Sequence, residues 1–124
     1  MWENTRGAIS VWRLTTADDF EAASNYGPYS GWLTLGMAMR PDNKLQLPWD
    51  HPSDHAFSLW RLSSTEVFEA ASTFGPYTGW GISDGDVDGN NKVHLLWRRD
   101  TGEVSLWRLS PTGTVENIAN YGPY

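Results

Sequence analysis

Alternating acidic residues run from Asp84 to Asp88 in the stretch DGDVDGN, which covers residues 84–90. Carboxylates at alternate positions can converge on a hard cation, and glycine permits the sharp turn that such a loop needs. The stretch is not an EF-hand, because Asn91 and Leu95 stand where that loop has an apolar residue and a glutamate. Two interpretations remain: a solvated acidic turn, or a weak calcium site formed by Asp84, Asp86, Asp88 and Asn90.

A second polar cluster combines two histidines and two aspartates at positions 50–55. The spacing of His51 and His55 would place both imidazoles on one face of a helix, but Pro52 and its turn-forming neighbours favour a loop. A metal site or an acid–base pair there would lack a third ligand at a recognisable spacing. The sequence also lacks a nucleophile elbow and a phosphate-binding glycine loop.

Aromatic side chains flank a repeated Gly–Pro corner. Tyr29 and Trp32 flank its first copy, and Tyr77 and Trp80 flank its second. A ring with an apolar face and a polar edge can stack on a sugar ring or on a partner protein. These four residues are therefore the candidate ligand-binding set. Most of the other tryptophans alternate with leucine and valine, which is typical of core positions.

These candidates belong to a sequence repeat. SVWRL begins at Ser10, and SLWRL begins at Ser58 and again at Ser105, so the spacings are 48 and 47 residues. The same spacings relate the three Gly–Pro–Tyr corners, and duplication of one structural unit explains the pattern. All eight tryptophans fall into equivalent sets: Trp2, Trp49 and Trp97; Trp12, Trp60 and Trp107; Trp32 and Trp80.

Each full unit is expected to contain four extended segments separated by turn residues. The SLWRL segment is apolar on both sides, which is typical of a sheet packed between two other sheets. The expected segments are Gly31–Met39 and Gly79–Val87, Lys44–Trp49 and Lys92–Trp97, the three SLWRL-type strands, and a last segment from about Phe20, Phe68 or Val115 into the corner.

The last segment has two interpretations. Residues 16–24 and 65–72 contain good helix formers, and Ser63 could cap a helix there. The equivalent stretch of the third unit carries Val115 and Ile118, which favour a strand. Since equivalent repeats share a conformation, we predict strands in all units, with a short helical turn in the first two as the alternative.

The motifs LLW, SLWRL and YGPYxGW resemble those of an uncharacterised group of bacterial tryptophan-rich tandem-repeat proteins, from Trp2 to Tyr124. Longer members of that group are propeller-like. The resemblance therefore implies an all-β fold of four-stranded antiparallel units similar to propeller blades. The group carries no agreed activity. The chain also resembles the short orphan reading frames of mobile gene cassettes.

We expect one repeat domain, 1–124, with a half unit at 2–29 and full units at 30–77 and 78–124. The half unit is expected to hold a third and a fourth strand. About two and a half units cannot close a ring, which needs at least about four blades. Repeat units also bury their faces against neighbours. We therefore expect self-association, as a two-fold homodimer.

Charge and composition exclude some classes of partner and site. Fifteen acidic and nine basic side chains give a net charge of −6, which disfavours binding to nucleic acid or to an anionic membrane. The absence of cysteine excludes disulfides and thiolate metal sites. No apolar run is long enough to cross a bilayer, and no signal peptide is recognisable. The location is therefore unknown, with the cytoplasm as the default.

Arginine and glutamate also recur together at the hairpin between the third and fourth strands. They can form a polar site in each unit, or a structural contact that fixes the hairpin, as a charge pair or as an arginine stacked on a tryptophan. Recurrence in every unit favours the structural role, because a catalytic centre is normally singular. The residues are Arg13, Arg61 and Arg108, and Glu21, Glu69 and Glu116.

The leading functional hypothesis is a non-enzymatic module that binds carbohydrate or protein at aromatic-lined grooves between units. The alternative is a structural or interaction protein without a small ligand, and a hydrolase ranks third. No cofactor is expected apart from the weak calcium site.

Overall fold

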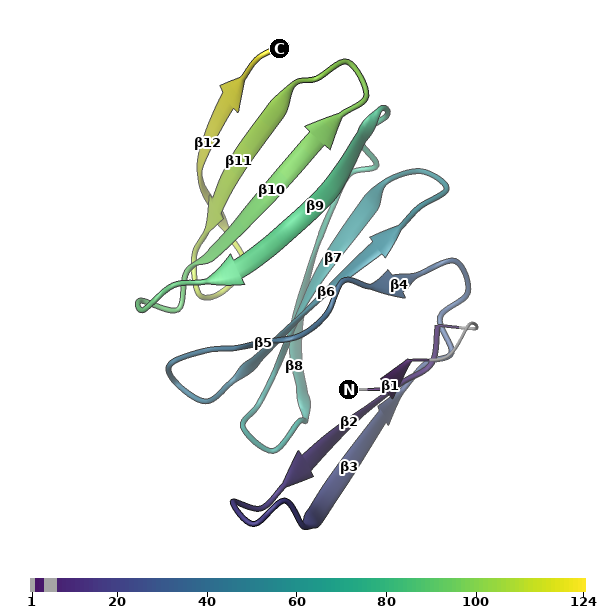
Figure 1. The fold of residues 1–124 in the computed structure, drawn as a ribbon, viewed down its shortest axis with the longest axis vertical. Helices are drawn as coiled ribbons and strands as arrows, with labels where there is room; N and C mark the ends of the chain where they lie inside the picture. Colours follow the sequence, from purple (N-terminus) through teal and green to yellow (C-terminus); the bar gives the residue numbers. More distant parts are fainter. Residues whose placement is uncertain (1, 4–6) are drawn as a thin grey trace.

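The computed structural model describes residues 2–3 and 7–124, and for residues 2–3 it describes the backbone only. Residues 4–6 of the predicted half unit 2–29 lie outside this part. Every regular element within it is a strand, and the strands form three antiparallel sheets. Figure 1 shows the sheets following one another in chain order, with the first at the bottom and the third at the top. The prediction of an all-β fold is therefore confirmed. The described residues contain no helix that is long and apolar enough to cross a membrane.

The first sheet has the order β1-β2-β3, from β1 (Trp2–Glu3), β2 (Ile9–Leu14) and β3 (Phe20–Tyr26). The sequence predicts only the last two strands here, so β1 is a correction. β1 pairs Trp2 with Ser10, the register that Trp49 and Ser58 have in the second sheet. Two residues are too short a strand to show an alternating pattern, which is why the sequence does not reveal it.

The second sheet contains β4 (Leu33–Thr34), β6 (Leu45–His51), β7 (Ala56–Leu62) and β8 (Phe68–Phe74), with β5 (Ala38–Met39) also paired to β6. The prediction of one continuous segment at Gly31–Met39 is wrong. Gly36 adopts a φ of 115°, which turns the chain between β4 and β5. The break faces Pro48, which has no N–H to give to a neighbouring strand, although its carbonyl accepts the N–H of Leu35 at 2.9 Å.

The third sheet has the order β12-β11-β10-β9, from β9 (Trp80–Val87), β10 (Val93–Arg99), β11 (Val104–Leu109) and β12 (Val115–Tyr121). Here the first strand is continuous. Its register to β10 shifts between Leu96 and Trp97, which is the position equivalent to the break in the second sheet. The first segment of the unit is therefore irregular at the same position in both repeats. It has a β-bulge in the third sheet and a strand break in the second.

The three hairpins between third and fourth strands have the same register. Ile9 pairs with Tyr26, Phe57 with Phe74, and Val104 with Tyr121. Each hairpin also has a register shift directly after its arginine. The prediction that the last segment is a strand in all three units is confirmed. The arginines are Arg13, Arg61 and Arg108.

The hairpin turns explain why the helix formers of the first two units do not form helices. Ser63 accepts the N–H of Val67 on its hydroxyl at 3.1 Å, so the capping serine closes a five-residue turn. Glu66 within that turn adopts a φ of 61°, which a right-handed helix does not allow. Asp18 and Gly113 occupy the equivalent positions with φ values of 64° and 88°.

Two hydrophobic cores fill the two junctions between sheets. The first joins Ile9 and Val11 of the first sheet to a group in the second sheet: Leu45, Leu47, Trp49 and Leu62. The second core joins β7 to the third sheet, through Phe57, Leu59, Val93, Leu95, Trp97 and Leu109. Strand β7 thus contributes to both cores, and each of its two faces packs into one of them. This matches the two-sided apolar pattern of SLWRL.

We predict that Leu62→Ala and Leu109→Ala each lower the free energy of unfolding by about 2–5 kcal/mol. Both side chains are fully buried, one in each core. The matched control is Leu35→Ala, whose side chain is 45% exposed and whose loss should cost less than about 1 kcal/mol. Urea denaturation measures all three values, and equal small losses would contradict the two-core arrangement.

Candidate ligand-binding site

Two pockets of similar composition lie in the second and third sheets. The Tyr29 pocket has a volume of about 150 Å³, and the Tyr77 pocket has a volume of about 250 Å³. Six positions of the repeat line both pockets. The Tyr29 pocket is lined by Tyr29, Trp32, Trp49, Ser58, Trp60 and Thr73. The Tyr77 pocket is lined by Tyr77, Trp80, Trp97, Ser105, Trp107 and Asn120, with Ile118 in addition.

Three rings form the same triangle in each pocket. In the Tyr29 pocket, the ring centroid of Tyr29 lies 5.6 Å from Trp49 and 5.3 Å from Trp60, and the two indoles lie 5.3 Å apart. In the Tyr77 pocket, the ring centroid of Tyr77 lies 5.6 Å from Trp97 and 5.7 Å from Trp107, and these two indoles lie 5.1 Å apart. Both tyrosines meet the indoles edge to face, which is a favourable aromatic geometry.

The Gly–Pro corner positions the tyrosine and the rim tryptophan of each pocket. The N–H of Trp32 donates to the carbonyl of Tyr29 at 3.1 Å, and the N–H of Trp80 donates to that of Tyr77 at 3.0 Å. A tight turn therefore brings both residues of each pair to the same pocket. Gly27 has a φ of 92°, and a Cβ there would lie 2.7 Å from the carbonyl oxygen of Gly7, so only glycine fits the corner.

Each pocket carries a buried serine hydroxyl. Ser58 lies 3.1 Å from the hydroxyl of Thr73. Ser105 donates to Asn120 at 2.6 Å and accepts the indole N–H of Trp107 at 2.9 Å. In both pockets these polar groups lie beside the aromatic rings. The side chain that bonds to the serine hydroxyl is a threonine in the Tyr29 pocket and an asparagine in the Tyr77 pocket.

Trp49 and Trp97 each carry an indole nitrogen that is buried without a hydrogen-bond partner among the described residues. Their side chains are 1% and 2% exposed and line the two pockets at equivalent positions. A buried donor without a partner is costly. Its recurrence at one position in both repeats makes this unpaired donor a feature of the repeat unit among the described residues.

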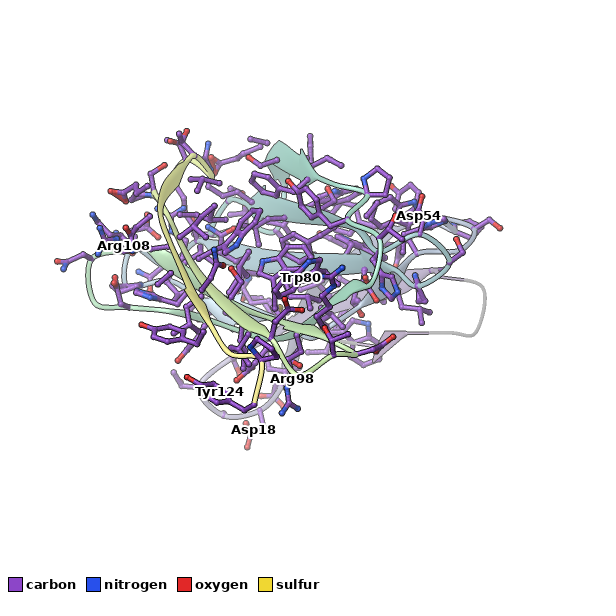
Figure 2. The ribbon with its side chains drawn as sticks, turned by 90° about the horizontal axis from the view of Figure 1, so that it is seen from above. Asp18, Asp54, Trp80, Arg98, Arg108 and Tyr124 are labelled. Atoms are coloured by element: carbon purple, nitrogen blue, oxygen red, sulfur yellow. The ribbon has the colours of Figure 1, made fainter. Side chains whose placement is uncertain are left out.

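A different side chain covers the rim tryptophan in each pocket. The imidazole of His51 lies 5.0 Å from Trp32, and the guanidinium of Arg99 lies 5.9 Å above Trp80. His51 and Arg99 occupy equivalent positions of the repeat. Asp54 contacts His51 at 2.8 Å, and Glu103 contacts Arg99 at 3.2 Å. Figure 2 shows Trp80 near the centre of the molecule when seen along its long axis.

Hydrogen bonds hold the pKa of two of these carboxyl groups below their ordinary values. For Asp54 the main cause is the N–H of Ala56, followed by the side chain of His51. For Glu103 the main cause is the hydroxyl of Thr101. The opposite holds for Asp50, where burial raises the pKa.

The four aromatic residues predicted from the sequence are brought together in pairs, Tyr29 with Trp32 and Tyr77 with Trp80. The sequence predicts core positions for the tryptophans that complete each pocket. Trp49 and Trp97 are buried as expected, but they also line the pockets. The serines were missed. Their fixed position two residues before a tryptophan in SLWRL was the signal that could have revealed them.

The predicted calcium residues are not brought together. Asp84 and Asp86 each accept the N–H of the following residue, at 2.9 and 2.8 Å. Asp88 accepts the N–H groups of Asn90 and Lys92 and contacts His94 at 2.8 Å. In the described part of the chain, no group of three or more His, Asp or Glu side chains could hold a metal ion.

The two imidazoles of the 50–55 cluster have different neighbours. His51 packs beside Gly31, whereas the ring of His55 faces Gly81 in the third sheet. The recurring charge pair is present in two hairpins, with Arg13 2.8 Å from Glu21 and Arg61 3.6 Å from Glu69. In the third hairpin Glu116 pairs with Lys92 at 2.9 Å, and no ion pair joins it to Arg108.

No protein-family model matches this sequence, and a search of curated proteins also finds no match. The function is therefore inferred from the geometry of the two pockets.

We predict that Asp54→Asn lowers the melting temperature near neutral pH. A pKa that is depressed in the folded state means that the carboxylate stabilises the fold above its unfolded pKa of about 3.9. This contribution is lost as the pH falls through the folded pKa. Thermal melts should therefore show a difference between variant and parent that shrinks below about pH 4. Asp100→Asn, in an exposed turn, is the control, and a difference that does not vary with pH would contradict the assignment.

We predict that calcium titration gives neither heat by calorimetry nor an increase in melting temperature. The carboxylates of Asp84, Asp86 and Asp88 already accept hydrogen bonds from neighbouring backbone groups. A heat signal that Asp86→Asn abolishes would show that this stretch rearranges around the ion.

Proposed function

We propose that the chain is a non-enzymatic binding module that takes one sugar ring in each of the Tyr29 and Tyr77 pockets. The observation that carries this proposal is the duplication of the pocket. The same six positions, the same aromatic triangle and the same unpartnered indole N–H recur in two sheets.

The chemistry of the pockets suits a neutral sugar. The C–H groups on one face of a sugar ring can pack on Tyr and Trp rings, while its hydroxyls can bond to polar groups at their edges. Ser58 and Ser105 supply hydroxyls, and the buried indole N–H groups of Trp49 and Trp97 have no hydrogen-bond partner among the described residues. The net charge of −6 disfavours an acidic ligand.

The volumes limit the size of what each pocket holds. Pockets for drug-sized ligands measure about 300–1,000 Å³, whereas these two measure about 150 and 250 Å³. Each suits a single ring rather than a long oligosaccharide. Two such sites on one chain would gain from avidity when they bind a ligand that presents the sugar repeatedly.

We also propose that the three sheets correspond to the blades of a propeller-like assembly. The stacking of sheets in chain order and the shared hairpin register support this comparison. The sheets do not close into a ring within the described chain.

The second candidate is an interaction protein without a small ligand. Large apolar side chains on the two outer sheets favour it, among them Leu14 at 49% and Leu106 at 45% exposure.

We predict that Trp32→Ala and Trp80→Ala each weaken sugar binding at their own pocket by at least about tenfold, and that the double variant binds no sugar. A glycan array selects the sugar, and calorimetry measures its affinity. The indole N–H signals of Trp49 and Trp97 in nitrogen-15 NMR spectra should shift on binding. Each signal should stop shifting in the variant of its own pocket only.

The control is Met39→Ala, which removes a side chain that is 63% exposed on β5, outside both pockets. Its affinity for the sugar should equal that of the parent. A blank glycan array, or sugar binding that survives in the double variant, would overturn the proposal and favour the interaction protein.

A further inference from the structure

The two junctions inside the chain show which face of one sheet packs on which face of the next. The face that carries Ile9 and Val11 packs on the face that carries Leu62, and the face that carries Phe57 and Leu59 packs on the face that carries Leu109. Each junction therefore joins two different faces of the repeat. One face of the first sheet and the opposite face of the third sheet are left without a neighbouring sheet.

We call the open face of the first sheet the Leu14 face, which carries Trp12 and Leu14. Leu14 is 49% exposed, whereas its equivalents Leu62 and Leu109 are 0% exposed. The first sheet thus carries an exposed leucine at a repeat position where the other two sheets carry a fully buried one.

We call the open face of the third sheet the Leu106 face, which carries Leu106, Arg108 and Tyr121. Leu106 is 45% exposed, whereas its equivalents Val11 and Leu59 are 2% and 4% exposed. A hollow of about 450 Å³ lies over this face, lined in part by these three residues. In the second sheet, the third sheet covers the equivalent surface.

We propose that a second copy of this chain occupies these surfaces, with the Leu14 face of one copy packed on the Leu106 face of the other. Two copies joined in this way at both ends form a two-fold ring of six sheets, since the described part of each chain forms three. Six lies within the range of about four to eight blades that closed propellers have.

Charge complementarity supports this arrangement. At the first junction, Arg13 reaches the hairpin turn of the next sheet and pairs with Glu66 at 3.1 Å. At the second junction, Arg61 reaches the equivalent turn and donates to the carbonyl of Pro111 at 3.1 Å. The next arginine in this series is Arg108 on the Leu106 face. The turn that it would meet in the second copy carries Asp18, at the position equivalent to Glu66.

The corner tyrosine supports the same arrangement. Tyr77 packs on two indoles of the following sheet and is 37% exposed, whereas Tyr124 is 92% exposed. Figure 2 shows Tyr124 at the periphery of the molecule. In the dimer, Tyr124 would pack on Trp12 of the second copy as Tyr29 packs on Trp60.

The acidic residues of β9 are compatible with such a junction. Asp84 and Asp86 also line the hollow on the Leu106 face. At the second junction, β9 of the third sheet lies against β5 of the second sheet. Both belong to the first segment of their unit. The described part of the first sheet contains no such strand. The two carboxylates would therefore stay in water when the second copy docks.

Light scattering after size-exclusion chromatography tests the proposal. The parent protein should have twice the mass of the 14.0 kDa chain. Leu14→Asp and Leu106→Asp should each give a folded monomer, because both side chains are exposed within one chain. An equimolar mixture of these two variants should form a mixed dimer, since it retains one intact pair of faces. Val67→Asp, at an exposed hairpin turn away from both faces, is the control and should remain dimeric.

A charge reversal tests the contact between Arg108 and Asp18. Arg108→Glu and Asp18→Arg should each weaken dimerisation by about tenfold or more, because like charges then meet. The double variant should regain most of the affinity. Sedimentation at several concentrations measures the three dissociation constants.

Three outcomes would overturn the proposal. The first is a parent protein that stays monomeric at about 100 µM, where a Kd below about 1 µM predicts a dimer. The second is a dimer that only one of the two aspartate variants disrupts, because this would mean that identical faces meet. The third is a series of larger open assemblies, which would mean that the junction does not close after two copies.

Discussion

Each sheet of this protein carries apolar side chains on both faces, and this constraint governs its architecture. A sheet of three to five short strands cannot bury two apolar faces by itself, so it needs a neighbour on each side. The middle sheet meets this requirement within the chain, because Leu62 and Trp60 face the first sheet while Phe57 and Leu59 face the third. The outer sheets meet it on one side only, and their outward faces retain apolar residues at the same repeat positions.

The pockets are a consequence of how consecutive sheets are joined. The Gly–Pro corner ends the last strand of one sheet and places a tyrosine against the indoles of the next sheet. The tyrosine, the rim tryptophan and the two inner tryptophans meet around a small space rather than filling it. A binding surface and a packing contact are thus made from the same residues. Duplication of the unit copies the pocket together with the fold.

The sequence predicts the strand content, the repeat and the two-sided middle strand because each depends on local patterns of residues. It does not predict the break between β4 and β5, because this depends on Pro48 in the neighbouring strand and on the φ of Gly36. It does not reveal β1, which is only two residues long.

The candidate site was predictable in part. Tyr29, Trp32, Tyr77 and Trp80 could be identified from their positions beside the corner. The tryptophans and serines that complete each pocket lie on other strands, and only the strand register brings them there. For the acidic stretch 84–90, spacing alone left two interpretations open, a solvated acidic turn and a weak calcium site. The backbone of β9 and its turn uses these carboxylates as local hydrogen-bond acceptors.

The contribution of β7 to both hydrophobic cores has a consequence for how the molecule comes apart. In repeat proteins, stability is approximately a sum of the stabilities of the repeats and of the contacts between neighbours, and parts of an array can melt separately. Here no sheet junction is independent of the middle strand, since Leu62 belongs to one core and Phe57 and Leu59 belong to the other. Loss of that one strand removes the packing of both ends at once. We therefore expect the chain to unfold in a single concerted transition, although its sequence is modular.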